Sequence, residues 1–132
     1  MNVELHLRNL RESLQVIEES ISKGVVDRQR NIGFNTSAAN SDMLEILLHK
    51  KSLIDPGFVV KHDWFDSKKK VEEKFPFDFP NKKDIFELMF RIESKRNLLC
   101  YGKPQKEEVI LELLQEFNKL KEKFKEAGLD EL

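Results

Sequence analysis

Several features that mark particular classes of protein are scarce in this sequence. Its 132 residues contain one cysteine, Cys100, which excludes an internal disulfide and any zinc site built from paired cysteines. No uninterrupted apolar run approaches the roughly 18 residues of a membrane-spanning helix. The first residues lack the apolar core of a signal peptide. We therefore expect a cytoplasmic protein with no membrane association.

An excess of charge of one sign is also missing. The 23 basic and 24 acidic residues leave a net charge of −1, so no global positive field drives non-specific binding to nucleic acid. The three histidines form no His-x3-His or Glu-x-x-His pair, and the sequence has no glycine-rich phosphate loop. We expect no metal site and no cofactor.

What the sequence does contain is helical periodicity over most of its length. With 39% hydrophobic and 36% charged residues, it is typical of a single helical domain covering residues 1–132. From Val3 to Lys23, apolar residues recur every three or four positions, and Gly24 is the expected end of that helix. A second long helix is predicted from Val26 to Ile54. Its first half is rich in small residues, which allow a neighbouring helix to approach closely.

Residues 55–80 form a connection that prolines and glycine interrupt. We predict one short helix within it, from Ser67 to Phe75, with Ser67 or Asp66 as its N-cap. The connection is also rich in aromatic residues, which we interpret as hydrophobic anchors rather than as a platform for stacking bases. These residues are Phe58, Trp64, Phe65, Phe75, Phe77 and Phe79.

Two further long helices are predicted after the connection. Asn81 is the expected N-cap of a helix from Lys82 to about Cys100, and Pro104 is expected in the first turn of a last helix that ends at Gly128. Short connections between successive long helices favour antiparallel neighbours. The predicted fold is all-α, an up-and-down bundle of four main helices plus one short helix.

Arg96 stands out because it falls on the apolar stripe of the helix that begins at Lys82. Burial of a guanidinium is costly unless the group is paired. Two interpretations follow. Arg96 forms an ion pair with Asp42 or Glu45 of the second helix, or it is positioned for a ligand.

The residues around Arg96 carry a resemblance to a known family. The run Arg96-Asn97-Leu98-Leu99-Cys100-Tyr101, followed by a charged helix, resembles the signature of the HEPN superfamily of nucleotide-binding helical domains. The resemblance implies a homodimeric bundle in which two such motifs meet in one cleft. It also implies a nucleotide or RNA ligand, and in some relatives a nucleotidyltransferase partner or a toxin–antitoxin pair.

Catalytic members of that family place a histidine after the arginine, whereas this sequence has Tyr101. A phenol is a poor base at neutral pH, although it can donate hydrogen bonds. The resemblance therefore implies a module that binds a nucleotide or RNA phosphate without catalysis, using Arg96, Asn97, Tyr101 and Lys103. The guanidinium suits this role because it contacts phosphate in a bidentate manner.

A second polar stretch opens the second helix. Arg30, Asn31 and Asn35 place donors on one side of it. We expect them either to line the cleft opposite Arg96, or to fix the helix register or make a dimer contact. Homodimerisation is also expected because the apolar and small-residue faces of the first two helices exceed what one short bundle covers.

The sequence also fits two alternative functions. The first is a metal-independent ribonuclease toxin, in which Tyr101 or His49 takes the place of the absent histidine. His62, beside Asp63, is another candidate general base, although adjacent side chains usually point apart. His6 is expected at the surface. The last alternative is a structural or protein-interaction bundle in which Arg96 only forms an ion pair.

Overall fold

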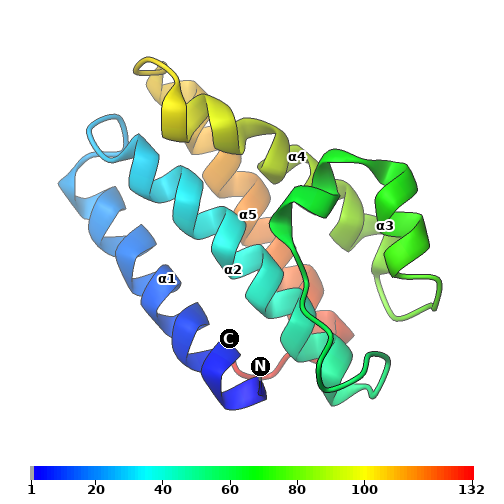
Figure 1. Ribbon diagram of the computed structural model, residues 1–132. Coiled ribbons are helices and arrows are strands. Elements are labelled where there is room, and N and C mark those ends of the chain that lie inside the picture. The colour runs from blue at the N-terminus through cyan, green and yellow to red at the C-terminus, as the bar shows by residue number, and fades with distance from the viewer. Residues whose placement is uncertain (1) are drawn as a thin grey trace.

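The protein is a bundle of helices. The computed structural model describes residues 2–132, and Figure 1 shows α2 in the middle of the bundle, α1 on one side of it, α4 on the other and α5 behind. The long helices are α1 (Val3–Lys23), α2 (Gln29–Lys50), α4 (Lys82–Tyr101) and α5 (Glu107–Ala127), joined by the short helix α3 (Lys68–Lys74) and the 3₁₀ helix η1 (His62–Asp66). The predicted all-α bundle of four main helices and one short helix is confirmed. Within the described residues, no helix is both long and apolar enough to cross a membrane.

The helix ends that glycine was expected to mark are confirmed. α1 ends at Gly24, whose φ of 118° is in the region that favours glycine, and whose N–H donates to the Ser20 carbonyl at 3.1 Å. α5 ends at Gly128, with a φ of 121°. Ser67 caps α3, because its side chain accepts a hydrogen bond from the Lys70 N–H. Of the other two helix starts, that of α4 at Lys82 is as predicted but lacks the expected side-chain cap, and that of α5 is later than predicted.

Asn81 occupies the N-cap position of α4, as predicted, but its side chain makes no capping hydrogen bond. Its backbone is left-handed, with a φ of 63°, and its amide Nδ2 donates to the Lys123 carbonyl at 3.2 Å and to a carboxylate oxygen of Glu126 at 3.1 Å. The side chain therefore ties the start of α4 to the end of α5. Local sequence does not indicate these two hydrogen bonds, because the acceptors belong to a distant helix.

Pro104 lies outside α5, which begins at Glu107. Gln29 of α2 accounts for the difference, since its side chain holds the connection between α4 and α5 in a non-helical form. The Gln29 Oε1 accepts from the Gln105 N–H at 2.8 Å, and its Nε2 donates to the carbonyls of Leu99 and Lys103, both at 3.2 Å.

α2 is the central helix and runs without a break through Gly33, as predicted, although it is shorter at both ends than residues 26–54. Of its small residues, Gly33 and Ser37 face α4 of the same chain, whereas Ala38 is exposed. A Cβ at Gly33 would lie 2.9 Å from the Leu99 Cβ and 3.0 Å from the Cys100 Sγ. The close approach of a neighbouring helix is confirmed. However, the small-residue face is covered within the chain, so it gives no reason to expect a dimer; α1, by contrast, leaves Leu5 and Ile21 exposed.

The aromatic residues of the connection anchor it to the bundle, as predicted. Phe75 is fully buried, and the centre of its ring lies 5.9 Å from that of Trp64 and 5.4 Å from that of Phe86 in α4. Trp64, Phe65 and the rest of η1 pack against α4 and α2. In Figure 1 this segment lies across the bundle beside the middle of α4. It closes one end of the contact between α2 and α4.

We predict that Gly33→Ala destabilises the protein by about 1–3 kcal/mol, since a methyl group would meet the Cβ of Leu99 rather than a flexible side-chain tip. The steric clash outweighs the gain of about 1 kcal/mol that alanine in place of glycine normally brings to a helix. The measurement is urea unfolding followed by circular dichroism. Gly57→Ala is the matched control, because nothing lies within 4 Å of its added Cβ, and we expect it to leave stability unchanged. A Gly33→Ala protein more stable than the wild type would contradict the close approach.

Candidate anion-binding site

The contact between α2 and α4 brings the unusual residues of both helices together. The helices run antiparallel, so that Gln29 lies opposite Leu99, Phe34 opposite Arg96, and Ser37 opposite Glu93. We call this line of paired residues the α2–α4 seam. Its register follows from the tight packing at Gly33, and it decides which side chains share a surface.

Two guanidinium groups share one aromatic ring on the seam. The Arg96 Cζ lies 4.9 Å from the centre of the Phe34 ring, and the Arg30 Cζ lies 5.6 Å from the same centre. Within residues 2–132, neither guanidinium makes an ion pair or a hydrogen bond to a side chain. A cation over a ring face is stabilised by only about 0.5–2 kcal/mol. Both groups therefore keep their hydrogen-bonding capacity for another molecule.

The alternative in which Arg96 pairs with Asp42 or Glu45 is wrong, because His6 occupies both carboxylates. The His6 Nδ1 lies 2.8 Å from the Asp42 Oδ1, and its Nε2 contacts the Glu45 Oε2. Only 1% of Glu45 is exposed, and its other oxygen accepts from the Val60 N–H at 2.7 Å. Burial raises the pKa of Asp42, and the hydrogen bond from His6 opposes that rise. His6, expected at the surface, is in fact buried in this cluster.

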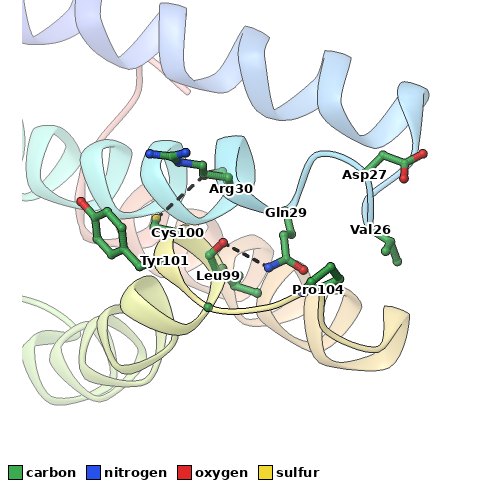
Figure 2. Close-up of a pocket in the computed structure, with 9 residues that line it drawn as sticks. Val26, Asp27, Gln29, Arg30, Leu99, Cys100, Tyr101 and Pro104 are labelled. Carbon is green, nitrogen blue, oxygen red and sulfur yellow. Dashed lines mark hydrogen bonds between the residues drawn. The ribbon is translucent and has the colours of Figure 1, made fainter.

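Tyr101 extends the site to the end of the seam. Its ring packs edge-on against Phe34, with the ring centres 5.7 Å apart, and the Arg30 Cζ lies 6.0 Å from the centre of the Tyr101 ring. Even so, 66% of Tyr101 is exposed. Figure 2 shows Arg30 and Tyr101 on one side of a hollow of about 650 Å³, and Val26 and Asp27, from the connection between α1 and α2, on the other.

The side chains of the remaining predicted residues do not bond to the two guanidiniums in the described part of the chain. Asn31 and Asn97 are exposed, and the Asn35 Nδ2 donates to the Asn31 carbonyl of its own helix at 2.8 Å. Lys103 lies in the connection after α4, where its carbonyl accepts from Gln29. In the part of the chain that the structure describes, no hydrogen bond or ion pair links the side chains of these four residues to Arg30 or Arg96. The structure thus brings together Arg30, Arg96 and Tyr101, and it adds Phe34, which the sequence did not single out.

His49 is too distant to take part in this site. It follows Phe34 by 15 residues on α2, which corresponds to about 22 Å along the helix axis. Its Nε2 instead lies 3.7 Å from the Glu45 Oε2 in the buried cluster around His6. His49 cannot replace the histidine that the family motif places beside the arginine.

A different histidine lies on the seam. The Nδ1 of His62, in η1, is 2.7 Å from the Glu93 Oε2, and the Ser37 Oγ donates to the Glu93 Oε1 at 2.7 Å. The carboxylate that orients His62 is thus Glu93 rather than its neighbour Asp63. Glu93 is one helical turn before Arg96 on α4, and this spacing is visible in the sequence. The pairing with His62 has no local signal, because it depends on how the connection packs.

The site offers cations and aromatic faces rather than metal ligands. Among the described residues, no group of three or more His, Cys, Asp or Glu side chains is arranged to hold a metal ion. Two guanidiniums that share a partly exposed ring are suited to a planar anion or to a phosphate, which accepts several hydrogen bonds at once.

Cys100 offers a probe of the charge at this site. The thiol is buried beside Gly33, and burial raises its pKa, whereas the positive charges of Arg96 and Arg30 partly oppose that rise. We predict that Arg96→Ala raises the pKa of Cys100 further, because the thiolate loses a neighbouring cation. The measurement is the pH dependence of the iodoacetamide reaction rate, whose midpoint should move to higher pH. Arg91→Ala, an exposed arginine on the same helix, is the control that should leave the midpoint in place. An unchanged midpoint in Arg96→Ala would contradict the proximity of the two groups.

No family model, no curated protein and no solved structure matches the chain. The likeness to the HEPN superfamily therefore rests on the residues from Arg96 to Tyr101 and on the helix that follows them.

Proposed function

We propose that this protein is a HEPN-like module that binds the phosphate of a nucleotide or of RNA on the α2–α4 seam. The observation that carries the proposal is the pair of guanidiniums, Arg30 and Arg96, on the Phe34 ring without a carboxylate partner among residues 2–132. The two groups lie 5.6 Å and 4.9 Å from one ring centre, so both contribute positive charge to the surface that an anion would meet there. Guanidinium groups also bind phosphate oxygens in pairs.

Two features support a nucleotide rather than free phosphate as the ligand. The hollow beside Arg30, at about 650 Å³, lies within the range of small-molecule sites, roughly 300–1,000 Å³. The exposed ring of Tyr101 on its edge provides a face on which a base can stack. Asp27, on the opposite side, offers carboxylate oxygens to the hydroxyl or amino groups of such a ligand.

The proposal extends to partners of the module. Val26, Leu98 and Tyr101 leave apolar surface exposed at this end of the molecule, which suits contact with a second copy or with another protein. The resemblance to the HEPN superfamily adds a nucleotidyltransferase or a toxin–antitoxin partner as candidates. Sedimentation of the purified chain tests the homodimer directly, since a monomer at micromolar concentration would remove it from the proposal.

We predict that a nucleotide stabilises the wild-type protein and that Arg96→Ala or Arg30→Ala removes this effect. A ligand present at a hundred times its dissociation constant adds about 2.7 kcal/mol to the free energy of unfolding. The measurement is the melting temperature with a panel of ribonucleoside mono-, di- and triphosphates and with inorganic phosphate. Arg91→Ala is the matched control, because its side chain is exposed and its nearest carboxylate, Glu116, is 4.0 Å away. We expect it to respond as the wild type does.

The outcomes separate the possible functions. A shift that needs both arginines supports the proposed site, and a larger shift with nucleotides than with inorganic phosphate supports a role for Tyr101 and the hollow. If no nucleotide or short RNA stabilises the wild type, the proposal fails and the structural or protein-interaction bundle stands.

A further inference from the structure

A groove separates α1 from α5 and shares no residue with the candidate anion-binding site. Both helices pack against α2, and within residues 2–132 they make no close backbone contact with each other. The groove between them has a volume of about 370 Å³, which is within the range of small-molecule sites. It is therefore a second place where this protein could hold a ligand.

The walls of the groove are mainly apolar. Ile17 and Phe117 are almost fully buried and form its inner part, whereas 46% of Ile21 is exposed to solvent. A molecule with apolar surface that covered these side chains would gain free energy by removing that surface from water. The apolar residues that line the groove are Leu14, Ile17 and Ile21 of α1, Leu114 and Phe117 of α5, and Leu132.

Two lysines of α5 give the groove positive charge. The Lys121 Nζ lies 5.3 Å from the centre of the Phe117 ring, and within residues 2–132 it makes no ion pair. Lys125 also lines the groove, and its Nζ lies 3.4 Å from its exposed neighbour Glu122. One carboxylate, Glu18, lies on the α1 side and is exposed. Because the two lysines outnumber this carboxylate, the groove favours an anionic group over a cationic one.

The apolar and the charged residues lie toward opposite ends of the groove. α1 and α5 run in opposite directions (Figure 1), so Ile21, late in α1, shares one end with Leu114, early in α5. Lys121 and Lys125 follow toward the other end. From Leu114 to Lys125 the groove extends about 16 Å along α5, a length that an extended dodecyl chain matches. An α-helix, about 10–12 Å across, is too wide for a groove of this volume.

We propose that the groove between α1 and α5 binds a long-chain fatty acid. The alkyl chain lies between the two helices, contacts Ile17 and Phe117, and covers the exposed side of Ile21. The carboxylate lies at the other end, where the ammonium groups of Lys121 and Lys125 meet it at the protein surface. Most of the affinity comes from the alkyl chain, because ion pairs exposed to solvent contribute little. The site goes beyond the proposed phosphate binding and does not depend on it.

The test is isothermal titration calorimetry of the full chain with dodecanoate, kept below the concentration at which it forms micelles. We expect one molecule to bind per chain. Octanoate should bind about tenfold more weakly or worse, since each buried methylene group improves affinity by up to about fourfold. Dodecyltrimethylammonium has the same alkyl chain and the opposite charge, and it should bind more weakly than dodecanoate.

Each substitution in the groove has a matched control outside it. Ile21→Asn should weaken dodecanoate binding by roughly fivefold to tenfold, whereas Leu5→Asn should not, because Leu5 is 44% exposed on α1 but does not line the groove. The double variant Lys121→Gln with Lys125→Gln should weaken binding by about threefold to tenfold and remove the preference for dodecanoate over the cationic amphiphile. Lys119→Gln, an exposed lysine of α5 outside the groove, should bind as the wild type does. Circular dichroism of each variant shows that a loss of binding is not a loss of fold.

Arg96→Ala separates this groove from the candidate anion-binding site, and we expect it to bind dodecanoate as the wild type does. If it abolishes binding, the carboxylate occupies the α2–α4 seam and the groove proposal is wrong. The proposal also fails if the wild type binds no dodecanoate, or if neither Ile21→Asn nor the double lysine variant weakens binding. If no dodecanoate binds and Ile21→Asn changes the sedimentation of the chain, the groove is instead a contact with a second copy.

Discussion

The close packing of α2 against α4 at Gly33 sets the position of every residue in the candidate site. With no side chain at this position, the backbones approach until Leu99 and Cys100 lie against α2. Because the contact is tight, the register of the two helices cannot slip without a clash. The register then pairs Phe34 with Arg96 and Ser37 with Glu93, so one absent methyl group determines which charges meet on the surface.

The helices could be predicted from the sequence because each carries its own apolar period and end signals, as α1 does between Asn2 and Gly24. Arg96 could be singled out because a cation interrupts that period. Its surroundings could not be predicted, since Phe34, Glu93 and His62 meet only through the packing of separate elements. The same reason accounts for the missing side-chain cap at Asn81 and for the error at Pro104, where contacts with α5 or side chains from α2 override the local preference.

Two polar clusters that contain a histidine flank α2, and the histidine is buried in one and partly exposed in the other. On the side of α1, His6 lies buried between two carboxylates, with its Nδ1 bonded to Asp42 and its Nε2 against Glu45. On the side of α4, His62 uses one nitrogen for Glu93 and remains partly open to solvent. A buried polar cluster joins the two helices it connects, whereas a ring nitrogen open to solvent can still bind another molecule. This contrast distinguishes a structural histidine from a candidate functional one without reference to any relative.

The placement of α1 has a consequence for how the molecule opens. Among the helices of residues 2–132, α1 has its close backbone contact with α2, while its side chains Leu14 and Ile17 line a groove whose other wall is α5. The His6 cluster attaches its first turn to α2. Helices with a single neighbour separate more readily than those held on several sides, and their amide protons exchange sooner. The amides of α1 should therefore exchange with solvent deuterium ahead of those in α2 and α4. Such an opening would uncover the side of α2 remote from Arg96, so that the outer helix fluctuates while the seam keeps its shape.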